Sequence, residues 1–372
     1  MREAIEQPTV RAEDATGLAA AALRAAAWTG EPFLRPDEDP AEALAEGRAR
    51  RRALDDALVE MEAGRRSPSS DWKIRYALML GLERVLTDHP PRLVSGTELR
   101  RHQIDALAGM LTELISRLEE SPENGNGQTL EAELEDEEFD EEIPEEEEPA
   151  PQEDPGAARR FRFRHPTASG KTIAAAGFVE AARTMGVLIL THRRLLVSQF
   201  NRELKAEGYG DRIMPQIEAG QEPLHGNPIT IQTYAWFARH VGSLSRTAYQ
   251  LVICDEAHTA LGEKTSAAIR SFPQPIYIGM TATEQLIAKQ VSDVFPASVD
   301  ELPLGDAARR GLIAPVRCLR VRPAAAISSV PIVGGDYDQE VLAKVLDHEL
   351  INQAAASLYR DRFDNTPGIV YA

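Results

Sequence analysis

The sequence predicts an α/β fold built around a parallel β-sheet, because short apolar runs alternate with helical segments after Arg159. The apolar runs cover residues 187–190, 229–231, 251–254 and 276–280. Runs without polar alternation are typical of strands buried on both faces, as happens when crossover helices cover a parallel sheet. We therefore expect flanking helices on this sheet, a helical region before it and an acidic insertion within it.

The helical region is expected over residues 1–90, which are rich in Ala, Leu, Arg and Glu. Helical stretches at 41–62 and 72–86 are separated by Pro and Gly. We interpret this part as a helical accessory region. The simpler alternative, a packing element that carries no site of its own, stays open.

The acidic insertion explains the net charge of −18. Between Leu118 and Ala158 there are 18 acidic residues and no Lys or Arg, and the remainder carries as many acids as its 41 Lys and Arg. Residues 119–156 hold only isolated apolar side chains, so they cannot bury enough surface to offset the entropy of ordering. We predict a disordered insertion. Because the rest is neutral, local basic surfaces can still bind nucleic acid.

The cysteine count and the hydropathy indicate a cytoplasmic protein. Cys254 and Cys318 are too few for a disulfide framework. No stretch approaches the roughly 20 apolar residues that span a bilayer, and the first residues lack a signal-peptide pattern. We expect neither secretion nor a membrane partner.

Residues 165–172 read HPTASGKT and nearly match a phosphate-binding loop, in which backbone N–H groups at a helix N-terminus hold phosphate oxygens. Lys171 would reach the β- and γ-phosphates, and Thr172 would bind Mg²⁺. His165 stands in place of the usual first Gly of such loops, and Ala168 stands where many such loops have Gly. A turn before a helix is the alternative. The expected nucleotide-binding residues here are Thr167, Ala168, Ser169, Gly170, Lys171 and Thr172.

Residues 251–258 read LVICDEAH, an apolar strand that runs into two carboxylates and a histidine. Open α/β sheets bind ligands at the carboxyl ends of their strands. Asp255 would bind the magnesium ion through water together with Thr172, and Glu256 would orient and deprotonate the attacking water. An ordinary acidic turn after a strand is the alternative.

These segments, in this order, resemble the superfamily-two helicases, most closely the branch of DEAH-box proteins and of the ATPase subunits of type I and type III restriction enzymes. The resemblance covers residues 98–372. It implies a RecA-like sheet, ATP and Mg²⁺ as cofactors, and a catalytic set of Lys171, Asp255, Glu256 and His258.

Two further segments follow from the resemblance. A Ser/Thr-Ala-Thr triplet couples ATP hydrolysis to nucleic-acid binding in that family, and Thr281, Ala282 and Thr283 match it. His258 is then expected to contact this coupling segment, the alternative being a structural histidine. LRRHQ resembles the adenine-reading segment, in which Gln103 would offer its amide to the adenine edge. A glutamine before a helix is also commonplace.

Loops at two strand ends stand where the relatives hold the nucleic-acid backbone. Hydroxyls, amides and Arg at such loops contact phosphates without reading sequence. Helix caps or solvated loops are the alternative for each residue. The expected nucleic-acid contacts are Thr191, His192, Arg193, Gln232 and Thr233.

Beyond the coupling segment, residues 304–315 resemble the crossing into a second RecA-like domain, and 334–346 resemble its early helical part. The arginine finger of the relatives lies further downstream, so we expect this chain to be a fragment that lacks most of the second domain. The expected organisation is a helical accessory region at 1–90, a first RecA-like domain at 91–300 interrupted by the insertion at 119–156, and a linker with the start of the second domain at 301–372.

The first expected strand departs from the family pattern, because residues 160–165 read RFRFRH instead of an apolar run. Alternating arginines predict that one face of this strand is exposed or paired.

The function that we expect is ATP-dependent movement along DNA or RNA as a helicase or translocase, with DNA the favoured nucleic-acid partner. One alternative is a double-strand DNA translocase of a restriction or phage-defence system, with nuclease or other defence partners, that does not unwind. The other is a regulatory nucleotide-binding module without turnover, although intact Lys171, Asp255 and Glu256 argue against it.

Overall fold

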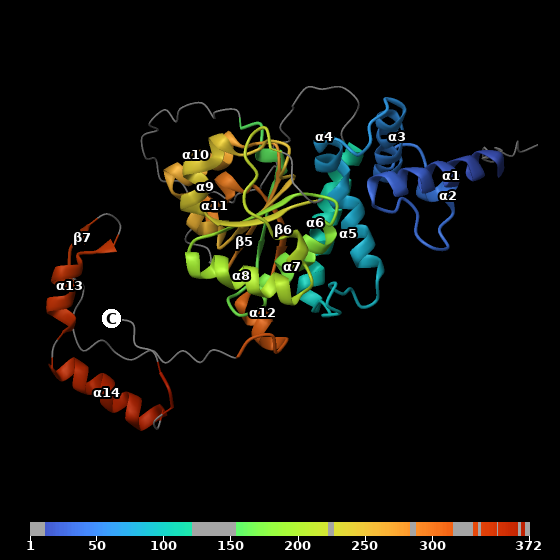
Figure 1. Ribbon diagram of the computed structural model, residues 1–372. Helices are drawn as coiled ribbons and strands as arrows, with labels where there is room; N and C mark the ends of the chain where they lie inside the picture. The colour runs from blue at the N-terminus through green and yellow to red at the C-terminus, as the bar shows by residue number, and fades with distance from the viewer. Residues whose placement is uncertain are drawn as a thin grey trace, which may run out of the picture. The chain divides into compact units, whose positions relative to one another are not determined.

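The computed structural model describes residues 12–120, 154–221, 227–282, 288–314, 330–333, 336–347, 349–363 and 366–368 (Figure 1). The chain divides into two compact units, Met1–Ala314 and Pro315–Ala372, each of which is described by itself. In the first unit, parallel strands form a 6-stranded sheet in the order β3-β2-β4-β5-β1-β6. Helices flank this sheet on both faces. The predicted RecA-like α/β fold is therefore confirmed.

The predicted apolar runs all form strands, and two further strands complete the sheet. The strands are β1 (Arg160–Arg164), β2 (Val187–Thr191), β3 (Ile229–Thr233), β4 (Leu251–Asp255), β5 (Ile276–Thr281) and β6 (Ala297–Glu301). Side chains alternate between two cores, as the pleat of a strand requires. In β4, for example, Leu251 and Ile253 belong to one hydrophobic core, whereas Val252 and Cys254 belong to the other.

Each core is closed by its own set of helices. One contains side chains of α5 (Leu78–Thr87), α6 (Arg101–Glu120), α7 (Lys171–Ala181) and α8 (Arg194–Ala206). The other contains side chains of α9 (Tyr234–His240), α10 (Glu263–Ser271) and α11 (Ala288–Val294), which lie on the opposite side of the sheet in Figure 1. Both faces of the central strands are thus buried, and the carboxyl ends of the strands meet at one edge.

The arginines of β1 are paired, as the sequence predicts, and their partners come from β6, from the two residues before β6 and from Asp154. Arg162 donates to the carbonyl oxygens of Phe295 and Pro296, and Arg164 forms an ion pair with Glu301 at 2.8 Å. The side chain of Arg160 is fully buried and paired with Asp154. A charged strand can lie inside this sheet because its neighbour β6 is acidic and follows a turn with open carbonyl groups.

The N-terminal helices pack against the same core as α7. They are α1 (Ala12–Thr29), α2 (Pro40–Ala43), α3 (Ala49–Glu62) and the short α4 (Ser70–Trp72), which runs through a π-helical turn into α5. The stretch predicted at 41–62 is broken into two helices because Gly47 adopts φ +84°, outside the helical region. At Gly81 of α5 a Cβ atom would lie 1.8 Å from the carbonyl oxygen of Ala181 in α7. The helices α5 and α7 therefore touch backbone to backbone.

A buried ion network reinforces this contact. Arg84 of α5 pairs with Glu31 at 2.9 Å and with Glu180 of α7 at 2.8 Å, and Arg183 pairs with Glu31 at 3.0 Å. Burial raises the pKa of Glu31, and the two guanidinium groups oppose that shift. Removing one partner of such a network leaves an uncompensated buried charge, which is strongly destabilising. The N-terminal helices and the α7 helix therefore form one packed body.

Of the predicted acidic insertion, residues 121–153 lie outside the described residues; Glu119 and Glu120 form the end of α6. After α12 (Leu304–Arg309), the second unit contains a β7–β8 hairpin of Ile332–Val333 and Asp336–Tyr337, followed by α13 (Gln339–Leu346) and α14 (Glu349–Phe363). Among the helices in the described ranges, none has the length and apolar character that a bilayer crossing requires.

Candidate nucleotide site

The HPTASGKT segment forms a tight loop between β1 and α7, which begins at Lys171. Gly170 caps the helix with φ +91°, and Ala168 adopts φ +66°. Left-handed backbone costs an L-residue roughly 1–2 kcal/mol, so the loop holds Ala168 in a strained conformation. Strained backbone is frequent at ligand sites, where successive N–H groups must point at one anion. The loop therefore has the shape of an anion-binding turn at a helix N-terminus.

The start of α6 holds this loop from behind. His102 donates from Nε2 to the Ser169 carbonyl oxygen at 2.8 Å, and Gln103 donates from Nε2 to the Gly170 carbonyl oxygen at 3.0 Å. The Gln103 Oε1 accepts from the Arg100 N–H at 2.8 Å, and the residue is 2% exposed. The amide that was expected to read adenine thus contacts the loop and its own helix start. Any base contact would use its remaining N–H or lone pair.

Lys171, Asp255 and Glu256 come together beside the loop. Lys171 Nζ lies 3.0 Å from Glu256 Oε1. Asp255 ends β4, and Glu256 turns out of the strand with φ +47°, so the two carboxylates leave the chain in different directions. Tyr234 donates its hydroxyl to the Asp255 carbonyl oxygen at 2.9 Å and fixes this corner.

Asp255 has a perturbed ionisation. Burial raises the pKa of its carboxyl group to about 6, with a further rise from Glu256 and an opposing effect of Lys171. A buried carboxylate of this kind gains most from a cation placed beside it. Thr172, on the first turn of α7, is half-buried. A hydroxyl and a carboxylate are oxygen donors of the kind that Mg²⁺ prefers, so the residues fit a magnesium ion.

His258 connects these acids to the end of β5. Its Nδ1 lies 3.3 Å from Thr281 Oγ1 and 3.6 Å from Glu256 Oε2. Burial lowers the pKa of its imidazole, which the nearby Glu256 partly opposes. Thr281 and Ala282 are described, and Thr281 is buried; Thr283 lies outside the described residues.

Comparisons with known proteins identify the family of the chain. The sequence profile of the family described as type III restriction enzyme, res subunit, matches residues 96–286, just over half of the chain. The chain belongs to this family. Its matched part is a superfamily-two helicase-like ATPase domain that holds the loop and both acids. Among curated proteins, none matches the chain.

Solved structures similar to the chain include three helicases. The helicase domain of Hef from Pyrococcus furiosus is 19% identical, with 44% of this chain and 39% of that chain covered and a TM-score of 0.35. A hypothetical ATP-dependent RNA helicase from Sulfolobus tokodaii is 21% identical, with 39% and 48% covered and a TM-score of 0.31. UvsW helicase from bacteriophage T4 is 15% identical, with 39% and 54% covered and a TM-score of 0.30. The chain spans about half the length of these structures, or less.

Residues to which the sequence assigned no role also border the candidate site. The Nε2 of His165 lies 2.6 Å from Asp300 Oδ2, and its backbone N–H donates to the Thr281 carbonyl oxygen at 3.0 Å. The His102 ring meets the His165 ring edge-on, with centroids 5.3 Å apart. The only sequence feature that pointed to any of these residues was His165 itself, which stands where the usual loop has Gly. Asp300 belongs to no motif. His102 lies within LRRHQ and Tyr234 directly follows the expected contacts Gln232 and Thr233, but neither was assigned a role.

The five expected nucleic-acid contacts fall into two groups. Thr191 is buried and donates its hydroxyl to the Arg193 carbonyl oxygen at 3.1 Å, and Thr233 caps α9 by accepting from the Trp236 N–H at 3.2 Å. These two hydroxyls shape the loops. The group with side chains available to a ligand comprises His192 and Arg193, which are exposed, and Gln232, which is half-buried.

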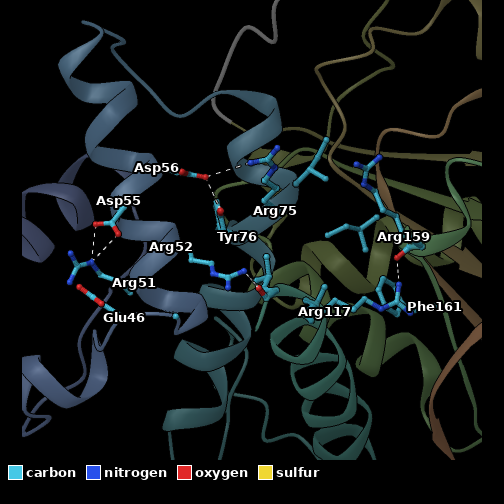
Figure 2. Close-up of a pocket in the computed structure, with 16 residues that line it drawn as sticks. Glu46, Arg51, Arg52, Asp55, Asp56, Arg75, Tyr76, Arg117, Arg159 and Phe161 are labelled. Carbon is cyan, nitrogen blue, oxygen red and sulfur yellow. Dashed lines mark hydrogen bonds and ion pairs between the residues drawn. The ribbon is translucent and has the colours of Figure 1, made fainter. Parts of the chain in front are cut away.

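Among the hollows on the described part of the first unit, two are compared with the loop, and the larger of them lies away from it. A hollow of about 200 Å³ is bordered by Pro166, Thr167, Ala282 and the start of α12. A much larger one, of about 1340 Å³, lies between α3, α6 and the amino ends of β1 and β5 (Figure 2). Figure 2 shows two ion pairs among the residues that line this hollow, Arg51 with Asp55 and Arg75 with Asp56.

Proposed function

We propose that this chain is the ATP-binding part of a motor that couples ATP hydrolysis to movement along nucleic acid, with DNA favoured as its track. The observation that carries the proposal is the meeting of Lys171, Asp255 and Glu256 at a strained phosphate loop. Membership of the res-subunit family supports it.

Nucleotide binding would use the backbone of the loop and Lys171. The N–H groups at the start of α7 and the positive end of the helix dipole favour phosphate oxygens. To reach the β- and γ-phosphates, the Lys171 ammonium would exchange its contact with Glu256, now 3.0 Å long, for phosphate oxygens. The exchange leaves Glu256 free to accept a hydrogen bond from water.

A magnesium ion would be held by Thr172 and, through water, by Asp255. When bound, it would neutralise the charge that develops on the phosphate oxygens. Binding requires the ionised form of Asp255, whose pKa is raised to about 6. The affinity of the site for the magnesium complex of ATP should therefore rise with pH.

Hydrolysis would use Glu256 as the general base. Its carboxylate is 21% exposed at the side chain and lies beside both Lys171 and His258, so it is oriented and still reachable by water. General-base catalysis contributes about 10²–10⁴-fold in rate. Asp255 and Glu256 thus divide their tasks between metal binding and proton transfer.

Coupling would pass through Thr281. The end of β5 contacts His258 from one side and accepts the His165 N–H from the other, so it touches both the acids and the phosphate loop. Movement of His258 on hydrolysis would shift the segment of Thr281, Ala282 and Thr283. His192, Arg193 and Gln232 would hold the strand backbone, with Thr191 and Thr233 shaping their loops.

A second candidate is a double-strand translocase that does not unwind, and the family description favours considering it. In a protein that includes a complete second RecA-like domain, we expect DNA-stimulated ATP hydrolysis. Strand displacement would identify a helicase, whereas displacement of a third strand from a triplex without unwinding would identify a translocase. Absence of nucleic-acid stimulation alongside normal ATP binding would favour the regulatory module and overturn the proposal.

A further inference from the structure

His102 lies directly behind the phosphate loop, and neither the motifs nor the family match assigns it a task. It is the second residue of α6 and is 1% exposed. Its Nε2 donates to the Ser169 carbonyl oxygen at 2.8 Å. We propose that His102 is a positioning residue, which aims the backbone N–H of Gly170 at the nucleotide phosphates. The inference rests on the proposed function, since it names what shapes the same site.

Peptide geometry carries the argument. A trans peptide unit is planar, so its carbonyl and its N–H point in opposite directions. The Ser169 carbonyl shares a peptide plane with the Gly170 N–H. When His102 holds that carbonyl toward α6, the Gly170 N–H must point away from α6. Gln103 holds the next carbonyl, that of Gly170, at 3.0 Å, which turns the Lys171 N–H the same way.

The direction of this hydrogen bond fixes the protonation of the ring. A carbonyl oxygen only accepts, so Nε2 carries the proton. Burial lowers the pKa of His102, which the hydrogen bond to Ser169 opposes. The hydrogen bond from Nε2 is thus made by a ring whose neutral form burial favours.

The imidazole is held in place by its neighbours. Its ring packs edge-on against His165, and the His165 Nε2 lies 2.6 Å from Asp300 of β6. His165 is fully buried where the usual loop has Gly. The side chain that replaces this Gly thus supports His102. A donor that cannot rotate holds the loop more firmly than a mobile one.

The loop needs such support because Ala168 is held at φ +66°. A glycine would adopt this conformation without cost, whereas alanine favours relaxation toward negative φ. Such relaxation would rotate the following peptide planes, including the one that carries the Gly170 N–H. The bond from His102 opposes that rotation at the next carbonyl along the chain.

The test compares His102→Phe, which keeps a ring of similar size without the donor, with His102→Gln, whose amide nitrogen reaches the position of Nε2. Binding of MgATP and competition by inorganic tripolyphosphate are measured on the folded chain, together with the melting temperature. We expect His102→Phe to weaken both ligands by roughly fivefold, the effect of about one hydrogen bond. His102→Gln should bind both within about twofold of the unchanged protein.

Two controls separate the outcomes. His240→Phe, at an exposed histidine of α9, should leave binding unchanged. If Lys171→Ala weakens MgATP binding but His102→Phe does not, the role of His102 is wrong and the nucleotide site stands. If neither variant changes binding, the proposed site itself is wrong. A loss for ATP without a loss for tripolyphosphate would place His102 on the base side and overturn the inference, as would a failure of His102→Gln to restore binding.

Discussion

The two ends of the sheet differ in how their charged groups are satisfied. At the carboxyl ends, the loop is strained at Ala168, Asp255 has a raised pKa, and Ser169 Oγ is buried with no hydrogen-bond partner in the described part of the chain. At the amino ends, a hollow of about 1340 Å³ is lined by five arginines that bond to carboxylates or backbone carbonyls of the chain. Volume and positive charge mark the second region, whereas strain and perturbed ionisation mark the first. Strain and perturbed ionisation indicate a functional site better than volume and positive charge do, so the carboxyl ends are the better candidate.

The largest effect is expected for Glu256→Gln. In a protein with a complete second domain, ATP hydrolysis should fall by at least about 100-fold, because the general base is lost. MgATP affinity should be retained or become tighter, since Lys171 no longer has an anionic partner at 3.0 Å. Phosphate release and equilibrium binding measure the two effects. A normal hydrolysis rate would show that the perturbed end of the sheet is not the catalytic one.

A smaller effect is expected for Gly170→Ala. The added Cβ would occupy left-handed backbone at φ +91° and lie 2.8 Å from Gln103 Nε2, so both the helix cap and the α6 contact must shift. We expect MgATP binding to weaken by about tenfold, the equivalent of roughly 1.4 kcal/mol.

Ala168→Gly is the matched control two residues away. It relieves positive φ at Ala168 and should keep MgATP affinity at or above that of the unchanged chain. Equal weakening by both substitutions would mean that the strained conformation of the loop is not what binds phosphate.

Between pH 5 and 7 the affinity for MgATP should rise by at most about tenfold, because the ionised fraction of a carboxyl group with a pKa of about 6 changes by that factor. Asp255 holds its proton more tightly in the folded chain, with a pKa of about 6 against 3.8 for an ordinary Asp carboxyl group. Its stabilising contribution is complete below pH 3.8 and is lost as pH rises through about 6. MgATP binding, which needs the carboxylate, should strengthen over the same rise.

Asp255→Asn removes the titrating group while it preserves the shape of the side chain. Its MgATP affinity should be weaker, and the difference between the variant and the unchanged chain should vary with pH between 5 and 7, as expected around a pKa of about 6. A constant difference across that interval, followed by calorimetry, would contradict the assignment of the metal-binding carboxylate.

The comparison also separates what sequence could predict from what it could not. The strands, the loop and the acids follow from local patterns, since apolar runs mark buried strands and GKT and DEAH mark strand ends. The partners of the β1 arginines were not predictable, because β6 is short, only partly buried and carries no motif. Its role depends on pairing over more than 130 residues, from Arg164 to Glu301.

Individual side-chain roles were the least predictable. Thr191 and Thr233 were expected at nucleic acid, yet their hydroxyls bond within their own loops, a choice that depends on local backbone geometry. Gln103 was expected at adenine, and its amide contacts the phosphate loop through a packing of α6 that the sequence does not encode locally. The adenine and nucleic-acid contacts stay predictions.

The most direct test of the central claim is a pair of substitutions at opposite ends of the sheet, with MgATP affinity measured by calorimetry. Lys171→Ala should weaken binding by at least about tenfold, because a charge-assisted contact to phosphate is worth roughly 1.5–3 kcal/mol. Arg75→Ala removes an exposed arginine that pairs with Asp56 in the hollow, and it should leave affinity unchanged. The opposite result, with affinity lost in Arg75→Ala and kept in Lys171→Ala, would place the nucleotide in the hollow and contradict the account.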